Sequence, residues 1–505
     1  MSRPPLRGPQ VGDLMAGLSV GLVLVPQALA YAVLAGMPPA RGLIVAVVAT
    51  IAAAPFASSP YLQTGPVAIT ALLTFGALEP LATPGTDEFV QLGILLALLV
   101  GIMRLVIGLI GEGGIAHLLS QPVVAGFTPA AAIVIAASQI PTTLGVTGGE
   151  GALIRKALHA MTNPAAWQVE TSILAALTVA TVLLAKRIHP LLPGVLIAVV
   201  SGIVYARLSD YTGPVIGSFA GTAMDPRFAL PWAEIEGLFV PALVIAVVGF
   251  GETAAIARTF AAETRTRWDV NREFVSQGVA NLASGLAGGF PAGGSFSRSA
   301  LARIAGTRTT WTGAISGVVA LLALPFTSVL ADLPAAILAG IILASVLSLI
   351  RVGPIKELLG FSRPQFLISA TTFALTLMLA PRLQWALVAG TALAIGWHLR
   401  RETLISVEEW VVGTTLHLRP SGVFYFASAQ VLQERLLDAL VERPDLDGLI
   451  VHFDRLGRVD VSAALSMRDL AEEASSAGVR MQVADLVPAG RPILTRVLGD
   501  DVIAG

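Results

Sequence analysis

Long apolar segments recur through the first 400 residues of the chain, separated by short polar or glycine-rich segments. An α-helix needs about 20 apolar residues to cross the roughly 30 Å of hydrocarbon in a bilayer. The pattern therefore predicts a polytopic α-helical membrane protein with 12 to 14 spans. Fourteen spans are assigned. The predicted spans are 11–32, 40–57, 65–79, 89–110, 119–140, 169–185, 191–207, 237–258, 272–288, 294–305, 309–328, 333–350, 365–380 and 383–400.

Two of these spans, 65–79 and 294–305, are too short to cross the bilayer, and glycine and proline precede both. If the helices divide into two halves of seven, these are the third and the tenth, in corresponding positions. An odd number of helices per half inverts the second half relative to the first. A matched pair of interrupted helices in inverted repeats indicates a transporter substrate site at the midplane. The alternative is that both are ordinary loops with misplaced helix ends.

The last hundred residues alternate strand-like and helical segments, which predicts a small α/β domain. Residues 1–401 hold 23 basic and 17 acidic side chains, whereas residues 402–505 hold 9 and 16. We therefore predict a membrane domain over 1–401, with repeats at about 11–207 and 237–400, and a cytoplasmic domain over 412–505. The predicted strands are Thr415–Leu418, Leu449–Phe453 and Val479–Val483, and the helices are Ala429–Val441, Ser462–Ser475 and Arg491–Leu498.

Composition agrees with a membrane location. Hydrophobic residues make up 55% of the chain and charged residues 13%, against roughly 25% charged in soluble domains. The chain has no cysteine, which excludes disulfides, thiolate metal sites and a catalytic thiol. We find no catalytic constellation, cofactor motif, metal-ligand spacing or nucleic-acid-binding pattern, so neither an enzyme nor a nucleic-acid partner is predicted.

Arginine and lysine predict the orientation of the helices. With the N-terminus inside, most basic residues fall on cytoplasmic ends, as the positive-inside rule requires. Both termini are then cytoplasmic, in the inner (cytoplasmic) membrane. The residues on that side are Lys186, Arg187, Arg258, Arg265, Arg267, Arg272, Arg303, Arg308, Arg351, Lys356, Arg363, Arg400 and Arg401.

Polar residues inside the short spans suggest an anion site. The tenth span begins with serines, and Arg298 adds one full charge a turn inside. The N-terminus of a buried half-helix presents unpaired N–H donors and a partial positive charge, which favour an anion. Gly65 allows the same close approach from the opposite side, with Pro66 suited to the first helical position. In the first span, Gln27 and Tyr31 are four residues apart and share a face; packing between helices is the alternative for them.

Glu252 is the only acid in a very apolar stretch, Val244–Ile256. A carboxylate there is costly, so it is expected to be paired, protonated or facing water. A carboxyl group that can hold a proton at neutral pH suits a proton-coupling site. The alternative is a fixed ion pair with Arg298 or Arg104. For Arg104 itself, snorkelling toward the cytoplasmic side is predicted.

Taken together, the motifs resemble the SulP (sulfate permease) family, whose bacterial members are related to animal solute-carrier anion exchangers. The resemblance covers almost the whole chain, and the soluble tail resembles the STAS domain that follows the membrane part in this family. It rests on Asp13-Leu14-Met15-Ala16-Gly17, Pro26-Gln27-Ala28-Leu29-Ala30-Tyr31-Ala32, Gly36-x-Pro38-Pro39-x-x-Gly42-Leu43, Thr64-Gly65-Pro66-Val67-Ala68, Asn271-Arg272-Glu273-Phe274-x-x-Gln277-Gly278-x-Ala280-Asn281, Gly288-Gly289-Phe290-Pro291 and Ser295-x-Ser297-Arg298-Ser299.

The resemblance implies fourteen helices in a seven-plus-seven inverted repeat, divided into a core that carries substrate and a gate, and a homodimeric assembly. It also implies that an acid on helix eight, here Glu252, couples a cation. Because Ile256 stands where sodium-coupled members have a hydroxyl residue, a proton is the predicted ion. The substrate-binding residues that the resemblance implies are Gln27, Tyr31, Gly65, Val67, Ala68, Phe296, Ser297 and Arg298.

The tail departs from free-standing STAS proteins, whose phosphorylated serine lies in an Asp-Ser-Ser/Ala-Gly run. This chain reads Asp460-Val461-Ser462-Ala463-Ala464, which argues against a phosphoswitch at Ser462. The prediction from the sequence is a secondary active transporter that moves a small carboxylate or dicarboxylate such as fumarate together with a proton. Bicarbonate or sulfate transport, a passive anion channel and a nucleobase–proton symporter remain the alternatives.

Overall fold

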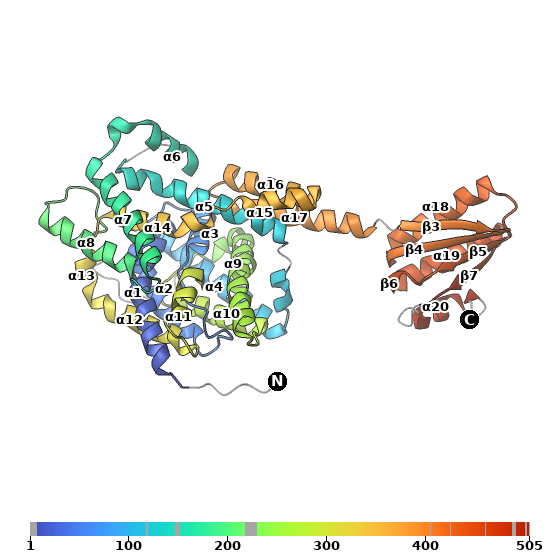
Figure 1. The fold of residues 1–505 in the computed structure, drawn as a ribbon, viewed down its shortest axis with the longest axis horizontal. Coiled ribbons are helices and arrows are strands. Elements are labelled where there is room, and N and C mark those ends of the chain that lie inside the picture. The colour runs from blue at the N-terminus through green and yellow to red at the C-terminus, as the bar shows by residue number, and fades with distance from the viewer. Residues whose placement is uncertain are drawn as a thin grey trace. The chain divides into compact units, whose positions relative to one another are not determined.

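The computed structural model describes residues 8–117, 120–146, 152–217, 230–403, 406–424, 426–459, 461–486, 491–499 and 502–503, in two compact units, Met1–Ala392 and Leu393–Gly505. A helix coincides with each of the fourteen predicted spans (Figure 1). These helices are α1 Val11–Leu34, α2 Pro39–Ala53, α3 Ala68–Leu78, α4 Asp87–Ile110, α5 Gln121–Leu144, α7 Val169–Ile188, α8 Gly194–Leu208, α9 Ile235–Thr264, α10 Val270–Leu286, α11 Phe296–Ile304, α12 Trp311–Ala323, α14 Ala335–Val346, α16 Arg363–Met378 and α17 Leu383–Thr403.

The described helices differ widely in length. Six of them are long and apolar enough to cross a membrane, namely α1, α4, α5, α7, and the helices that contain α9 and α14. The helices α3 and α11 have 11 and 9 residues, so each is only about 14–16 Å long and cannot span alone. Three additional short helices, α6 Leu153–Thr162, α13 Thr327–Leu330 and α15 Gly353–Phe361, connect the spans.

The packing of the helices follows a two-fold inverted repeat. If α1–α5, α7 and α8 are exchanged for α9–α12, α14, α16 and α17, several of the main contacts map onto one another. Helix α2 packs on α12 as α10 packs on α4, and α1 packs on α12 as α9 packs on α4. Likewise, α7 packs on α14 as α16 packs on α5. Helices α1–α4 with α9–α12 therefore form the core, and the remaining six spans form the gate.

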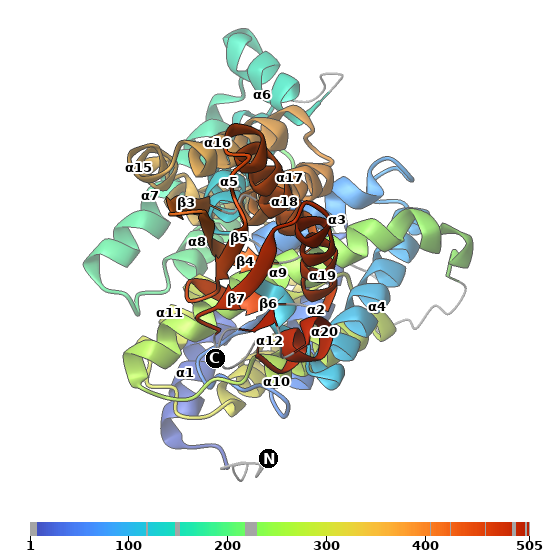
Figure 2. The ribbon, with the colours of Figure 1, turned by 90° about the vertical axis from the view of Figure 1, so that its right-hand side faces the viewer.

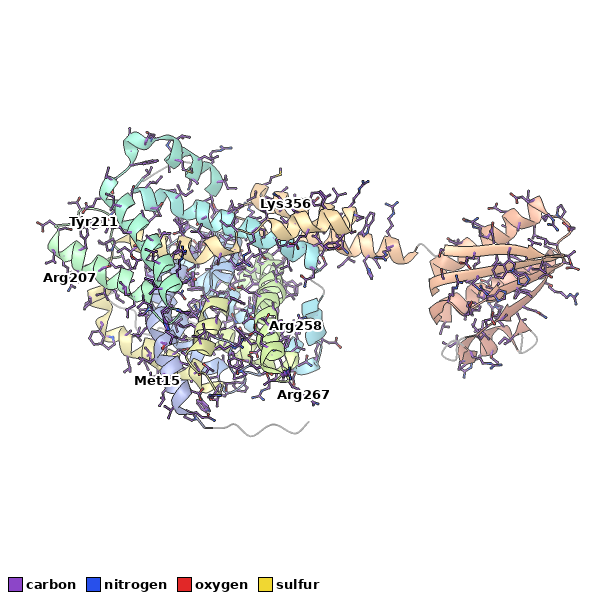
Figure 3. All side chains as sticks on the ribbon, viewed as in Figure 1. Met15, Arg207, Tyr211, Arg258, Arg267 and Lys356 are labelled. Atoms are coloured by element: carbon purple, nitrogen blue, oxygen red, sulfur yellow. The ribbon has the colours of Figure 1, made fainter. Side chains whose placement is uncertain are left out.

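Figure 3 shows which chain segments share a side of the first unit. Arg207 and Tyr211, at the end of α8, lie on the opposite side from Arg258 and Arg267, at the end of α9. The beginning of α1 lies on the same side as the end of α7, because Ser19 and Lys186 line one cavity.

A buried carboxylate joins the first helix to the second half of the core. Asp13 is fully buried near the start of α1 and accepts hydrogen bonds from the backbone N–H groups of Arg308 and Thr309 at 2.7 and 2.8 Å. The hydroxyls of Thr309 and Thr312 donate to the same carboxylate at 2.7 and 3.1 Å. Asp13 thus satisfies backbone N–H groups of the segment that leads into α12 and binds the Thr312 hydroxyl in the first turn of that helix.

We expect Asp13→Asn to destabilise the membrane domain. The amide has one acceptor oxygen and an N–H₂ group that would face the same N–H donors, so at least one charge-assisted bond is lost and one donor is left unpaired. The expected cost is about 2–4 kcal/mol, measured as a lower midpoint of thermal unfolding in detergent. Glu88→Gln, in the exposed first turn of α4, is the control. An unchanged midpoint for Asp13→Asn would show that these bonds contribute little.

The second unit is a mixed sheet covered by helices on one face (Figure 2). The strand order is β3-β4-β5-β7; β3 and β4 are antiparallel, β4-β5 and β5-β7 are parallel, and β6 pairs with β4. Leu416, Leu418, Leu449 and Val451 pack against the helices in a buried core. The elements are β3 Ser406–Val412, β4 Thr415–Phe424, α18 Phe426–Glu442, β5 Gly448–His452, β6 Leu456–Val459, α19 Val461–Ser476, β7 Arg480–Ala484 and α20 Arg491–Leu498.

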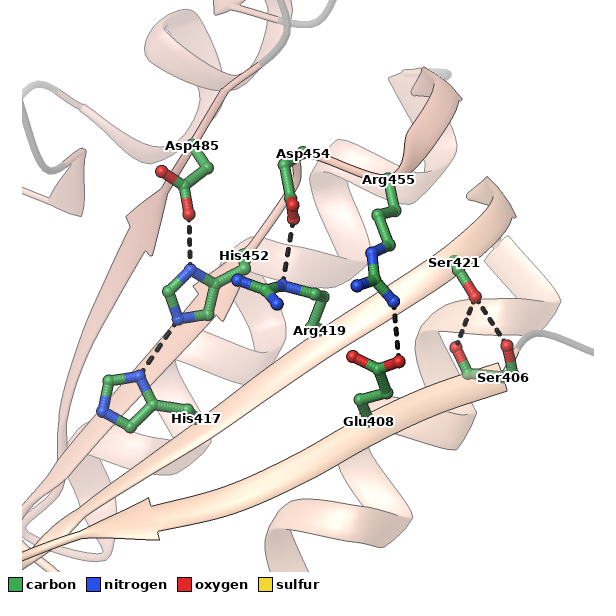
Figure 4. A network of polar contacts seen from close by, with 9 residues as sticks. All are labelled: Ser406, Glu408, His417, Arg419, Ser421, His452, Asp454, Arg455 and Asp485. Atoms are coloured by element: carbon green, nitrogen blue, oxygen red, sulfur yellow. Dashed lines mark hydrogen bonds and ion pairs between the residues drawn. The ribbon is translucent and has the colours of Figure 1, made fainter.

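Alternate residues of the same strands carry polar and aromatic groups on the opposite face (Figure 4). The His417 and His452 rings share a hydrogen bond of 3.0 Å between Nδ1 and Nε2, and His452 Nδ1 lies 2.6 Å from Asp485 Oδ2. Trp410 stacks on both histidines, with ring centroids 5.1 and 5.3 Å away. Arg419 lies over Trp410 and pairs with Asp454.

The histidine pair predicts a pH dependence for this domain. Burial, with the nearby His452 and Arg419, holds the pKa of His417 below its ordinary value. The unfolded chain then binds the proton more readily, so stability is complete above the unfolded pKa of about 6.5 and falls as the pH drops through it. Protection factors of the β4 and β5 amides in the full chain, which correct for the intrinsic pH dependence of exchange, should therefore decrease from pH 7.5 to pH 5.5. His417→Gln should weaken this dependence, whereas His189→Gln, outside the domain, should not.

Candidate functional site

Two short extended segments meet inside the core, directly before α3 and α11. Strand β1 (Thr64–Gly65) pairs antiparallel with β2 (Gly293–Gly294), with Thr64 opposite Gly294 and Gly65 opposite Gly293. Non-helical backbone within a membrane must be satisfied by protein, and here each segment satisfies the other. Gly65 has φ of +144°, and a Cβ on Gly294 would lie 2.8 Å from the Thr253 hydroxyl. Glycine is therefore required by backbone conformation in one strand and by close packing in the other.

Amide side chains of α10 extend this pairing. Asn281 accepts a hydrogen bond from the N–H of Ala292 at 2.9 Å and donates to its carbonyl at 3.2 Å. Gln277 donates to the Thr64 hydroxyl at 2.7 Å. The side chains of Asn281, Gln277 and Thr64 are fully or almost fully buried. The sequence analysis assigned Gln277 and Asn281 no role, although two amides four residues apart in an apolar span could have indicated one.

The pairing brings the N-termini of α3 and α11 together in the core. Val67 is the N-cap of α3, and Ser295 is the N-cap of α11, where its hydroxyl accepts from the N–H of Arg298 at 3.4 Å. The first N–H groups of each helix have no carbonyl partner within the helix and carry its partial positive charge. The prediction that Pro66 is the first helical residue is wrong: α3 begins at Ala68, because Val67 is still extended and serves as its N-cap.

Arg298 lies between these helix starts and is only 1% exposed. Its Nη2 donates to the Pro66 carbonyl at 3.0 Å and its Nη1 to the Gln27 side-chain oxygen at 3.2 Å. Its Nε is buried, with no acceptor among the residues that the structure describes. The guanidinium charge of Arg298 therefore lies beside the partial positive charges of the two helix N-termini. No carboxylate among the described residues lies at ion-pair distance from it.

Helix α1 supplies the two other polar groups predicted for the site. Gln27 and Tyr31 are both buried, and Gln27 contacts Arg298 directly. The Tyr31 hydroxyl interacts with Ser345 of α14 and with the charge of Arg298. Gln27 and Tyr31 therefore lie where the core helix α1 faces the gate helix α14.

A cavity of about 350 Å³ reaches this site from the side where α1 begins. Gln27, Phe296 and Ser297 lie at its inner end, and Phe296 is 53% exposed. Core helices α1 and α11 form one wall, and the gate helices α7 and α8 form the other. Lys186 is the one charged side chain among the residues that line it. Gly65, Val67 and Ala68 do not line this cavity; Gly65 and Val67 are buried on either side of Pro66, whose carbonyl accepts from Arg298.

Glu252 belongs to the same region but makes no ion pair. It is half-buried in α9, next to Thr253, whose hydroxyl accepts from the N–H of Gly294 at 3.1 Å. The charge of Arg298 acts on it through space, yet no described cation lies within 4.0 Å of its oxygens. The described residues therefore do not form the fixed ion pair of Glu252 with Arg298 or Arg104 that was considered as the alternative.

Arg104 has a different environment from the one predicted. It is fully buried, with three donors on backbone carbonyls: Nε on Ala246 at 3.1 Å, Nη2 on Ile245 at 2.8 Å and Nη1 on Ala292 at 2.9 Å. The prediction that it snorkels to the membrane surface is wrong, because these carbonyls satisfy the guanidinium inside the core. Arg104 joins α4, α9 and the segment before β2.

Within the second unit, Ser462 lies in the first turn of α19, which begins at Val461. Asp460 lies outside the described residues, as does the Ser462 side chain.

Comparison with known proteins agrees with this architecture. Residues 11–372 match the sulfate permease family, and residues 410–503 match the STAS domain. The chain is 34% identical to "Probable sulfate transporter MT1781" of Mycobacterium tuberculosis, over 77% of this chain and 70% of that one. It is 29% identical to "Sulfate transporter 4.1, chloroplastic" of Arabidopsis thaliana, over 94% and 75% of the two chains.

Two solved structures share the fold. Murine Slc26a9 in the inward-facing state superposes with a TM-score of 0.88 at 17% identity, covering 98% of this chain and 88% of that one. The transmembrane domain of the cyanobacterial bicarbonate transporter BicA gives a TM-score of 0.66 at 24% identity, covering 75% and 97%.

An inverted-repeat membrane fold with a buried cation between two helix N-termini defines an anion transporter. The chain belongs to the sulfate permease family, and its second unit is a STAS domain. The family and the fold that the sequence motifs predict are thereby confirmed.

Proposed function

We propose that this chain is a secondary active transporter that moves a small carboxylate or dicarboxylate, such as fumarate, together with a proton. The observation that carries the proposal is the position of Arg298 between the starts of α3 and α11, with its Nε unpaired in the described structure. A planar guanidinium can bind a carboxylate through two parallel hydrogen bonds. Phe296, Ser297, Gln27 and Tyr31 complete the substrate site, with Gly65, Val67 and Ala68 supporting it from below.

Transport is proposed to follow movement of the core against the gate. Substrate contacts come from α1, α3 and α11, all in the core, whereas the cavity leading to them is closed on its other side by α7 and α8 of the gate. Sliding of one part past the other would carry Arg298 from this cavity to the opposite face. The chain is placed in the inner membrane as a homodimer, with both termini in the cytoplasm.

Sulfate is the second candidate substrate, favoured by the names of the relatives, and bicarbonate the third. Proteoliposomes containing the purified chain should be tested with labelled fumarate, sulfate and bicarbonate, with and without an inward proton gradient. We expect fumarate to accumulate against its gradient only when the outside is more acidic. Accumulation of sulfate instead of fumarate would identify sulfate as the transported anion. Flux that only equilibrates the anion would identify a channel, and uptake of uracil alone would identify a nucleobase symporter.

Lys186 is expected to attract the anion into the cavity by its positive charge. Lys186 is the one charged residue among those that line the cavity. It lies one helix turn after Val182, which lines the gate wall. We expect Lys186→Gln to raise the half-saturating concentration of a dianion applied to the cavity face roughly 3- to 10-fold, because about 1 kcal/mol of attraction is lost. The value for the opposite face should not change. Arg187→Gln is the matched control, since Arg187 does not line the cavity; equal effects of the two variants would contradict the assignment.

A further inference from the structure

A second hollow lies on the outer face of the gate, away from the transport site. It has a volume of about 570 Å³ and is bounded by α7, α8 and α14. Its walls are mostly apolar, formed by Ile173, Leu174 and Leu177 of α7, Ala198 of α8 and Ile337 of α14. Ile173 and Leu177 are exposed although they belong to an apolar helix long enough to span the membrane. The hollow, here called the gate groove, therefore opens toward hydrocarbon.

The gate groove has the length of one leaflet. Its wall on α7 runs from Val169 to Thr181, which corresponds to about 18 Å at 1.5 Å per residue. Half of a bilayer's hydrocarbon core measures about 15 Å. The groove begins at the end of α7 opposite Lys186 and stops at Thr181, about two-thirds of the way along the helix. A single acyl chain of the leaflet on that side matches this depth.

One end of the gate groove is polar. There the Tyr205 hydroxyl donates to Glu170 Oε1 at 2.8 Å, which leaves Oε2 as an acceptor. Glu170 is the one charged residue among those lining the groove. Trp167, half-exposed two residues before α7, occupies the position where aromatic side chains mark the membrane interface. The acidic group therefore lies at the level of the lipid headgroups.

We propose that the gate groove binds a phospholipid with an ammonium headgroup, such as phosphatidylethanolamine. One acyl chain lies along α7 and α8, and the ammonium group donates to the Glu170 carboxylate. The groove is built from gate helices alone, so the lipid stays with the gate while the core moves. Ser201, a small residue of α8 on the groove wall, leaves room for the chain.

The test is native mass spectrometry of the full-length chain, delipidated in detergent and incubated with equal amounts of dioleoyl phosphatidylethanolamine and dioleoyl phosphatidylglycerol. No transported anion is present, so the result is independent of the proposed transport function. We expect the bound ethanolamine lipid to exceed the glycerol lipid about fivefold, the ratio that about 1 kcal/mol produces. Ser201→Phe and, independently, Ile173→Trp should reduce total bound lipid at least about fivefold by filling the groove. Glu170→Gln should keep the lipid but lose the headgroup preference.

Two variants serve as matched controls. Val204→Phe adds the same ring to the same helix outside the groove, and Glu88→Gln removes an exposed acid elsewhere. Both should bind lipid like the wild type. Equal retention by Ser201→Phe, Ile173→Trp and Val204→Phe in monodisperse protein would overturn the proposal, as would a missing headgroup preference in the wild type. If the two groove-filling variants change the oligomeric state while lipid retention is unchanged, the occupant is a second copy of the chain and the lipid proposal is wrong.

Discussion

Arg298→Gln is expected to weaken anion binding by about 2–3 kcal/mol, or roughly 30- to 150-fold in affinity, because a charge-assisted contact in a poorly hydrated site is lost. Gln27 and the Pro66 carbonyl, which accept from the guanidinium, would each lose a donor. Binding of fumarate and sulfate to the purified variant in detergent, by titration calorimetry, measures the change. The starts of α3 and α11 remain in place, so residual weak binding is expected.

Two comparisons separate charge from structure in this experiment. Arg298→Lys should recover only part of the affinity, because an ammonium group lacks the planar pair of donors. Arg303→Gln, on the same helix, should bind like the wild type, since Arg303 is partly exposed and pairs with Glu263. Thermal unfolding of all three shows whether the core is intact. Wild-type affinity in a stable Arg298→Gln protein would remove Arg298 from the substrate site.

The transmembrane helices and their division into two halves could be predicted because both depend on the local pattern. Apolar length locates each span, and glycine with proline marks the short pair α3 and α11. The contacts that connect these elements could not be predicted. Strands β1 and β2 have two residues each, which is too short for any alternation of polar and apolar positions. Their pairing depends on residues more than 200 positions apart.

Arg104 shows how burial can reverse an interpretation based on sequence. An arginine near the end of an apolar helix usually extends to the interface, and nothing in its neighbours indicates otherwise. Its three acceptors are carbonyls of α9 and of the segment before β2, so only the tertiary structure reveals them. In the STAS domain, β4, β5 and β7 agree with the predicted strands. Strands β3 and β6 were missed, because β3 is an edge strand without a buried alternating pattern and β6 has only four residues.

Glu252→Gln is expected to remove coupling to protons while leaving the anion site intact. The amide resembles the protonated acid, so the variant cannot take up and release a proton in each cycle. A gradient of one pH unit supports about tenfold accumulation when one proton moves with each anion, because one unit corresponds to about 1.4 kcal/mol. We expect this accumulation to disappear in Glu252→Gln proteoliposomes, while exchange of labelled for unlabelled anion continues. Glu236→Gln, at the exposed start of the same helix, should accumulate substrate like the wild type.

The stability of the same variant distinguishes coupling from a structural role. If Glu252 balanced a buried arginine, its neutralisation would leave that cation uncompensated at a cost of about 3–5 kcal/mol. The hydrogen bonds of Arg298 go instead to Gln27 and Pro66, and those of Arg104 go to carbonyls. Glu252→Gln should therefore unfold at nearly the wild-type temperature. Simultaneous loss of stability and exchange would support the structural role. A stable variant that still accumulates anion in response to a pH gradient would show that another group carries the proton.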